Sequence, residues 1–410
     1  MRKRTVKALL CMILVLSMVF VGCGQAAPAA SSEAGTQAAP AGDGASAESS
    51  AQGAPGGKVK VALVGPMTGD SAQYGQQFQR GVEVFIEEYN SKGGYNGSPI
   101  ALTVFDDKND AKEAVNIGNK IVSEGDYFAV IGPFSSTCAL AMAEVLDEEK
   151  VLTISPSVSH PDYVTNFDYT FRLSHVNTIE GAFVAKYCAQ KWGSQKMAAI
   201  YSQNDWGMTL DEAFLEGCKE QNLEVVANEP FILGQTKDFS PIITKIKQAG
   251  ADTVFLMCQY AEAGQLLQQI RGMGLNDIKI FVSSSAYKGE TLELAGEAAE
   301  GALWCSTFMV DNPDPLLQAF RKTVKEKYDA EVDNMIVRAY DCMMVAFTAL
   351  DKSQKMDSDS IKNEIMDIRE FTGVSGTFKF FDDRNVDRRF YITGPDGNGS
   401  YKFLEDPELK

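Results

Sequence analysis

Apolar and polar residues alternate along most of the chain in two periods, one typical of strands and one typical of amphipathic helices. Residues 59–64 form a short apolar run, and apolar residues then recur at helical spacing between Phe78 and Tyr89. Residues 313–369 are expected to be mostly helical and residues 377–403 to form short strands. The same reasoning predicts strands at 59–64, 100–105, 128–131, 151–155, 197–201, 224–228, 252–257 and 278–282, and helices at 136–148, 178–191, 207–221 and 261–273.

This alternation predicts an α/β fold with two lobes. Strands that alternate with helices of about 10–15 residues form parallel sheets with helices on both faces. The pattern starts again near residue 178, and about 350 residues follow residue 57, too many for one hydrophobic core. Ligands of such sheets bind near the carboxyl ends of the strands. The loops to inspect are 65–75, 132–137, 155–161, 202–207, 258–262 and 283–289, all rich in small polar or aromatic residues.

The N-terminal segment has the features of a bacterial export signal. Basic residues at positions 2–4 and 7 precede an apolar run at 8–21, which is short for a membrane-spanning helix of about 20 residues. Gly22 and Cys23 follow, and this junction resembles a lipobox. The resemblance implies a signal peptide at 1–22, cleavage before Cys23 and a lipid on the Cys23 thiol.

Residues 23–57 are predicted to be a lipidated cysteine followed by a flexible tether. The stretch 24–57 is mostly Ala, Gly, Ser, Pro, Gln and Glu, and it contains no aromatic residue, Val, Leu or Ile. Such a segment cannot bury enough apolar surface to fold. We therefore expect an exported protein, anchored to the outer face of the cell membrane by Cys23.

Composition narrows the remaining function classes. The net charge of −17 disfavours nucleic acid, whose phosphates require basic patches. The chain has two histidines and none of the HExxH, GxGxxG, GxxxxGK[ST] or GxSxG motifs, so we expect no metal site and no cofactor. Six cysteines lie in apolar segments and are expected to be buried free thiols, although their spacing leaves a disulfide possible: Cys138, Cys188, Cys218, Cys258, Cys305 and Cys342.

Eight short motifs occur in a characteristic order from Lys58 onward. They are VALVGPMTG at 61–69, AQYG at 72–75, NSKGG at 90–94, DD at 106–107, VIGP at 130–133, ISPS at 154–157, DFS at 238–240 and AGEAAEG at 295–301. As a set they resemble the leucine/isoleucine/valine-binding proteins, which have the type I periplasmic-binding-protein fold. The resemblance implies two Rossmann-like lobes with parallel sheets, joined by a three-strand hinge and closing on a ligand.

The resemblance also places the boundaries of these lobes. The hinge crossings should lie near 173–176, 305–308 and 387–390. The first lobe should then comprise residues 58–175 plus 308–388, and the second lobe 176–307 plus 389–410.

A set of ligand contacts follows from the same resemblance. Ser136 matches the residue that holds the ligand carboxylate through its hydroxyl and backbone N–H, and a helix N-terminus suits an anion, although a simple capping serine would look the same. Ser157 would offer its backbone carbonyl and Ser159 its hydroxyl. Tyr74 matches an aromatic residue that lines the side-chain pocket. Trp206 matches one that covers the ligand from the second lobe, unless it only packs at the edge of the cleft.

Two departures from the family pattern concern the ligand's ammonium group. Ser284 stands where the leucine binders have a glutamate for that group, and Gln259, followed by Tyr260, replaces a tyrosine. A charge-assisted hydrogen bond contributes about 1.5–3 kcal/mol, so its loss would weaken ammonium binding about 10–100-fold. Either Asp205 or Glu262 reaches into the site, or neutral acceptors suffice, or the ligand lacks a free amine.

We therefore interpret the chain as the substrate-binding lipoprotein of an ABC importer. As a monomer it would capture an amino acid, by default a branched-chain one, and pass it to permease and ATPase subunits. Alternatives are a binding protein for an amide, a urea-like molecule or an amine-free carboxylate, and a sensing module without transport. The remaining alternative is an enzyme, which would need a catalytic pair. The only candidate pair is Ser159 with His160, and His160 is better interpreted as a loop residue.

Overall fold

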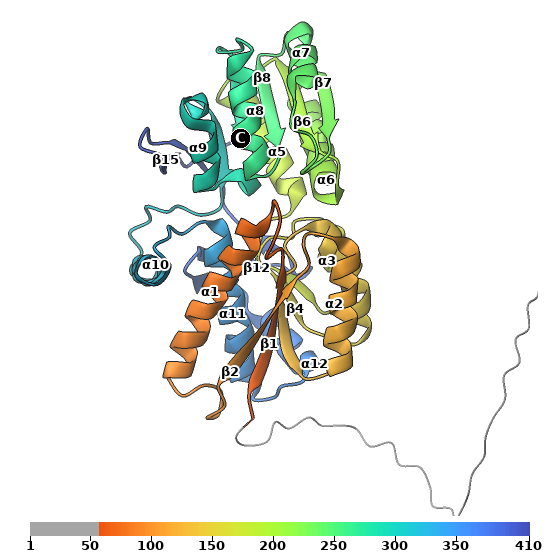
Figure 1. Cartoon of the computed structure of the whole chain (residues 1–410), viewed down its shortest axis with the longest axis vertical. Helices are drawn as coiled ribbons and strands as arrows, with labels where there is room; N and C mark the ends of the chain where they lie inside the picture. Colours follow the sequence, from red (N-terminus) through yellow and green to blue (C-terminus); the bar gives the residue numbers. More distant parts are fainter. Residues whose placement is uncertain (1–56) are drawn as a thin grey trace, which may run out of the picture. The chain divides into compact units, whose positions relative to one another are not determined.

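The computed structural model describes residues 57–410, so the predicted signal peptide, Cys23 and nearly all of the predicted tether lie outside the described residues. Within 57–410 the chain forms two α/β lobes, each built on its own sheet (Figure 1). The predicted fold class is confirmed. No helix among residues 57–410 combines the length and the apolar character that a bilayer crossing requires.

The first lobe is built on a parallel sheet with the strand order β2-β1-β3-β4-β5. Its strands are β1 (Val59–Gly65), β2 (Ile100–Asp106), β3 (Tyr127–Ile131), β4 (Thr153–Ser155) and β5 (Thr170–Arg172). The sequence pattern missed β5, because it has only three residues and one of them is the fully buried Arg172. β4 is shorter than the predicted strand at 151–155.

Helices cover both faces of this sheet. They are α1 (Ala72–Ser91), α2 (Ala111–Glu124), α3 (Ser136–Glu148), α4 (Asp162–Thr165), α10 (Pro315–Tyr328), α11 (Asn334–Ser353) and α12 (Ser358–Asp367). Successive side chains of a strand point to opposite faces. Val61 and Leu63 of β1 accordingly join the core under α1 and α11, whereas Ala62 and Val64 join the core under α2 and α3.

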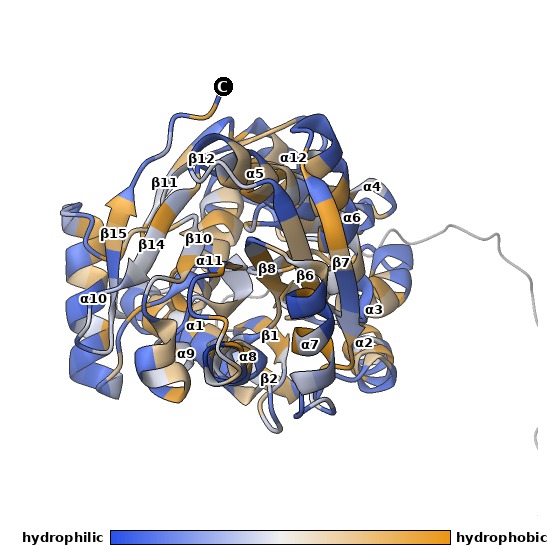
Figure 2. Cartoon of the chain, turned by 90° about the horizontal axis from the view of Figure 1, so that it is seen from above, coloured by the Kyte–Doolittle hydropathy of each residue, from blue (hydrophilic) through white to orange (hydrophobic). Residues whose placement is uncertain are grey.

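The second lobe is built on a seven-stranded sheet with the order β15-β14-β10-β9-β8-β6-β7. Its strands are β6 (Lys196–Ser202), β7 (Glu224–Phe231), β8 (Thr253–Met257), β9 (Lys279–Val282), β10 (Leu303–Ser306), β14 (Tyr391–Pro395) and β15 (Tyr401–Glu405). β6 to β9 pair in parallel, as predicted, and β10, a strand that the sequence pattern missed, continues the parallel part of the sheet. β14 and β15 are antiparallel because a short turn joins them into a hairpin. Figure 2 shows hydrophobic residues on β8 and β10 within this sheet.

The helices of the second lobe are α5 (Asn177–Gln190), α6 (Asp205–Glu220), α7 (Ser240–Ala249), α8 (Tyr260–Gly272) and α9 (Gly289–Ala295), with short 3₁₀ turns η1 (Ser284–Ala286) and η2 (Gly296–Ala299). The interior strand β8 again divides its side chains between two cores. Phe255 and Met257 pack under α5 and α6, whereas Val254 and Leu256 pack under α7 and α8.

The chain passes between the lobes at 173–176, 307–314 and 388–390, the connections from β5 to α5, from β10 to α10 and from β13 to β14. A small antiparallel sheet precedes the third crossing and comprises β11 (Glu370–Gly373), β12 (Gly376–Phe380) and β13 (Val386–Asp387). The six cysteines of the described residues are buried and free, which confirms the prediction for them.

Asp107, directly after β2, carries a buried carboxyl group with one poorly satisfied oxygen. Its Oδ1 accepts a hydrogen bond from the Asn109 backbone at 2.9 Å, while Oδ2 has no partner among the described residues. Burial raises the pKa of Asp107 to about 6. Because the folded-state pKa lies above the unfolded value of about 3.9, ionisation destabilises the fold progressively as the pH rises through this range.

We therefore predict that Asp107→Asn raises the free energy of unfolding by about 1–2 kcal/mol at pH 7.5 and gives no gain near pH 4. Urea unfolding of the ligand-free protein at both pH values measures this difference. Asp382→Asn is the control, since that side chain is 90% exposed. A gain of equal size at both pH values would rule out the buried charge as its cause.

Candidate functional site

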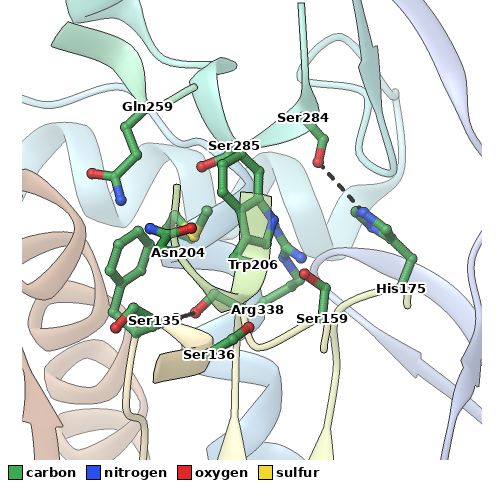
Figure 3. Close-up of a pocket in the computed structure, with 13 residues that line it drawn as sticks. Ser135, Ser136, Ser159, His175, Asn204, Trp206, Gln259, Ser284, Ser285 and Arg338 are labelled. Carbon is green, nitrogen blue, oxygen red and sulfur yellow. Dashed lines mark hydrogen bonds between the residues drawn. The ribbon is translucent and has the colours of Figure 1, made fainter. Parts of the chain in front are cut away.

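A pocket that is partly open to solvent lies where loops of both lobes meet. The loops after β3, β4, β6, β8 and β9 contribute to it, together with the first crossing and the start of α11. These are mainly the carboxyl ends of parallel strands, where the fold is expected to bind ligands. The lining residues, most of them labelled in Figure 3, are Phe134, Ser135, Ser136, Ser157, Ser159, His175, Asn204, Trp206, Gln259, Ser284, Ser285, Met335 and Arg338.

The N-terminus of α3 forms one wall of the pocket. The side chain of Ser135 caps this helix and accepts a hydrogen bond from the Cys138 backbone at 3.3 Å. Ser136, the first helical residue, is 1% exposed, and its hydroxyl has no hydrogen-bond partner among the described residues. Ser135 therefore caps the helix, while the hydroxyl of the adjacent Ser136 is not used by the described protein groups. An unpartnered hydroxyl beside a helix N-terminus suits an anionic ligand group.

Ser157 and Ser159 lie on the neighbouring loop after β4. The Ser157 hydroxyl donates to the carbonyl of Phe134 at 2.6 Å, which fixes this loop against the one that precedes α3. Ser159 is 3% exposed, and its hydroxyl makes no hydrogen bond to another described residue. Ser159 is therefore able to use its hydroxyl on a ligand, while the Ser157 hydroxyl is already engaged.

Trp206 reaches the pocket from the first turn of α6. The preceding Asn204 caps that helix, its Oδ1 accepting from the backbone N–H of Gly207 at 2.8 Å. A Cβ atom at position 207 would lie 2.1 Å from the carbonyl oxygen of Ser202, so glycine is required for the close approach of strand and helix. This tight turn determines where the Trp206 side chain lies.

Tyr74 and Tyr260 do not line the pocket, unlike the other six predicted contacts. Tyr74 is fully buried and stacks on Phe134, with the ring centroids 4.1 Å apart, so Phe134 forms the aromatic wall in its place. The Tyr74 hydroxyl donates to the carbonyl of Ser285 at 3.1 Å and accepts from the backbone N–H of Tyr260 at 3.2 Å. Both tyrosines therefore connect the lobes behind the pocket wall.

Other direct contacts between the lobes surround the pocket. Ser71 donates to the side-chain oxygen of Gln259 at 2.9 Å, and Thr137 donates to the carboxylate of Asp205 at 2.6 Å. Gln259 therefore both lines the pocket and joins the lobes. Because these bonds cross the cleft, separating the lobes would break them.

A buried carboxylate, Glu180 of α5, lies behind Ser284. It accepts hydrogen bonds from the Ser284 backbone at 2.7 Å, the Ser284 hydroxyl at 2.9 Å and the His175 ring at 2.5 Å. Burial opposes ionisation, but the interactions with His175 and Ser284 outweigh it, and the pKa of Glu180 is lowered. The other ring nitrogen of His175 is buried in the pocket wall without a partner among the described residues.

Neither acid that the sequence suggested for an ammonium group lines the pocket. Asp205 is engaged with Thr137, and Glu262 accepts a hydrogen bond from the Gly234 backbone at 3.0 Å. His160 also lies outside the lining, where its Nδ1 accepts from the Asp162 backbone at 3.1 Å. Among the described residues the lining contains no carboxylate at all.

Sequence reasoning missed seven lining residues: Phe134, Ser135, His175, Asn204, Ser285, Met335 and Arg338. For one of them a signal existed. Arg338 interrupts a helix in which residues 334–343 are all buried, and a buried arginine in such a stretch requires a partner.

A model of periplasmic binding proteins matches residues 58–400. The chain belongs to this family. It is 27% identical over 323 residues to the leucine-, isoleucine-, valine-, threonine- and alanine-binding protein of Pseudomonas aeruginosa, covering 78% of this chain and 85% of that protein. Members of the family are binding proteins rather than enzymes, and the family indicates an exported protein.

Solved structures share the fold. A leucine-binding protein from Thermotoga maritima superposes with a TM-score of 0.80 at 24% identity, covering 85% of this chain and 98% of that chain. A solute-binding protein of an ABC transporter from Rhodopseudomonas palustris, in complex with benzoate, superposes with a TM-score of 0.77 at 20% identity, covering 85% and 95%. The fold therefore occurs both in a leucine-binding protein and in one that holds an amine-free acid.

The cluster around Glu180 generates a stability prediction. A depressed carboxyl pKa contributes stability that is present above the unfolded pKa of about 4.3 and is lost as the pH falls through the folded value. Glu180→Gln should therefore lower the free energy of unfolding by about 2–4 kcal/mol at pH 7.5, and by less near pH 4. Urea unfolding of ligand-free protein measures this.

Glu262→Gln is the matched control, because burial raises the pKa of Glu262 instead. Glutamine can still accept the hydrogen bond from Gly234, so this variant should be neutral or slightly more stable at pH 7.5. Equal losses in the two variants would contradict a specific role for the His175–Glu180 pair.

Proposed function

We propose that this chain is the exported, lipid-anchored binding subunit of an ABC importer and captures a small carboxylate solute of amino-acid size between its lobes. The observation that carries this proposal is the unpartnered hydroxyl of Ser136, buried in the pocket wall beside the N-terminus of α3. Ser136, Ser159 and the α3 amides would hold the carboxylate, and Trp206 would cover the ligand. No bond of the ligand would be broken.

Lobe closure would couple binding to transport. A ligand that contacts both lobes stabilises the arrangement in which they meet, and a permease can recognise that arrangement. The bonds from Ser71 to Gln259 and from Thr137 to Asp205 would form in the same step. The protein would act as a monomer with permease and ATPase subunits.

The basic n-region, the apolar run at 8–21 and Cys23 support export and lipid attachment at Cys23. The stretch after Cys23 would then tether the folded body to the membrane.

Branched-chain amino acids are the first ligands to test, because the Pseudomonas relative is named for binding them. An amine-free carboxylate is the second candidate, and a specific observation favours it: the described lining offers no carboxylate to an ammonium group. The benzoate complex of the Rhodopseudomonas protein provides a precedent within this fold.

Isothermal titration of the purified chain with leucine, isoleucine, valine, alanine, the keto acid of leucine and benzoate tests the proposal. At least one of these should bind. Ser136→Ala should weaken that binding by about 10-fold or more without lowering the free energy of unfolding, because no hydrogen bond to protein is lost.

Ser194→Ala is the matched control, for which we expect the opposite effects on affinity and on stability. Ser194 is equally buried, but it lies in the second lobe outside the pocket, and its hydroxyl bonds that of Thr253 at 2.7 Å. The variant should lose about 1 kcal/mol of stability and keep its affinity. Failure of every solute in the panel to bind would overturn the proposed function.

A further inference from the structure

Arg338 places an unpaired guanidinium group in the pocket wall. The residue lies in the second turn of α11, is 3% exposed and lines the pocket together with Ser159 and Trp206 (Figure 3). Its Nε donates to the carbonyl of Asn334 at 2.7 Å, which orients the group. The two terminal nitrogens make no hydrogen bond to the described residues, and no carboxylate among those residues lies within ion-pair distance of Arg338.

The acidic side chains whose charges act on Arg338 already have other partners. Asp333 pairs with Lys288 at 2.6 Å and caps α11 through the backbone of Met335 and Ile336. Asp341 accepts hydrogen bonds from the backbone N–H groups of Val374 and Ser375. Glu180, as described above, is engaged with Ser284 and the His175 ring.

Arg338 is therefore a buried cation without an ion-pair partner. The three acids attract its charge only from beyond ion-pair distance. Burial lowers the pKa of Arg338 to about 10, and Asp333 only partly opposes this shift, so the group stays protonated at neutral pH. Leaving such a charge without a partner is costly. Its free nitrogens form a planar fork that matches the two oxygens of a carboxylate.

The rest of the lining reinforces this charge preference. Its other polar groups are hydroxyls, two amides and the His175 ring, and it contains no aspartate or glutamate. A zwitterionic amino acid would add an ammonium group to a pocket that already holds Arg338 and no acid. A monoanion would instead balance the guanidinium and leave no charge unpaired.

The apolar part of the lining suggests where the ligand's body lies. Phe134, Trp206 and Met335 come from three different elements and supply an aromatic or thioether surface on the walls of the pocket. Such surfaces suit a branched aliphatic or aromatic group.

Resting on the proposed function, we propose that Arg338 is the specificity-determining residue of this pocket. It pairs with the ligand carboxylate, and the ligand is an amine-free monocarboxylate with an apolar body. This class includes branched-chain keto acids and aromatic acids.

The decisive comparison uses two probes with the same carbon skeleton, leucine and its keto acid. Isothermal titration of the purified full chain should show that the keto acid binds about 10–100-fold more tightly, since only leucine brings an ammonium group into the cationic pocket. Benzoate serves as the aromatic member of the class.

Substitution of Arg338 tests its role. Arg338→Met should weaken binding of the keto acid by about 100-fold. Any binding of leucine should weaken much less, because the variant also removes the positive charge that repels the ammonium group. Arg338→Lys keeps the charge but not the planar fork, and it should lose about 10-fold. Arg369→Met is the control with unchanged affinity, because that arginine lies outside the pocket, where it pairs with Asp382 and is 65% exposed.

The outcomes separate this inference from the proposed function. If leucine binds more tightly than its keto acid, or if Arg338→Met binds the keto acid as wild type does, the inference is overturned and the proposed function stands. If neither probe, nor benzoate, nor any other amino acid of the panel binds, the proposed function itself fails. Should Arg338→Met not fold, the ranking of the two probes on wild type and the Arg338→Lys variant still decide.

Discussion

Buried polar groups need hydrogen-bond partners, and around one pocket of this protein several of them have none. The Ser136 hydroxyl and the Nδ1 of His175 are buried in the same lining without a partner among the described residues. The buried Arg338 belongs to this lining too, and its only hydrogen bond to the described residues is the one from Nε. Unsatisfied groups of this kind cost about 1–3 kcal/mol each, and more when charged. We propose that a ligand bound where the two lobes meet would satisfy these groups, its carboxylate accepting from the Ser136 hydroxyl and from Arg338.

The fold brings these groups together from distant parts of the chain. Ser136 follows β3, Arg338 lies two hundred residues later in α11, and His175 belongs to the first crossing between the lobes. The His175 ring also packs edge-on against Phe390 of the third crossing, with the ring centroids 4.7 Å apart. Pocket and hinge therefore share a residue. A ligand that engages His175 would therefore contact a segment that connects the two lobes.

Much of this architecture could be predicted from the sequence, because it depends on local periodicity. Most strands of both sheets, the start of α3 at Ser136 and the two-lobed division follow from alternating apolar runs and from helix-start chemistry, whereas β10 was not predicted. β5 could not be recognised from three residues that include Arg172. The antiparallel β14–β15 hairpin at the edge of the second sheet depends on long-range pairing that local patterns do not encode.

The sequence predicted the pocket-lining residues that closely follow a strand, but few of those that lie inside helices. Six of the eight predicted contacts line the pocket, because they lie in loops at the carboxyl ends of strands or at helix starts next to them. Tyr74 lies one layer behind the wall, since Phe134 occupies the surface in front of it. Arg338 and Glu180 lie inside helices, and only tertiary packing determines that one reaches the pocket while the other supports Ser284 from behind.

A crystal structure of the chain with the small molecule that co-purifies with it would show which groups of the pocket hold the ligand. We expect an amine-free ligand between the lobes, with carboxylate oxygens about 3 Å from the Ser136 hydroxyl and from the terminal nitrogens of Arg338. A ligand whose carboxylate lies away from both groups, or whose ammonium group occupies the space beside Arg338, would contradict this expectation.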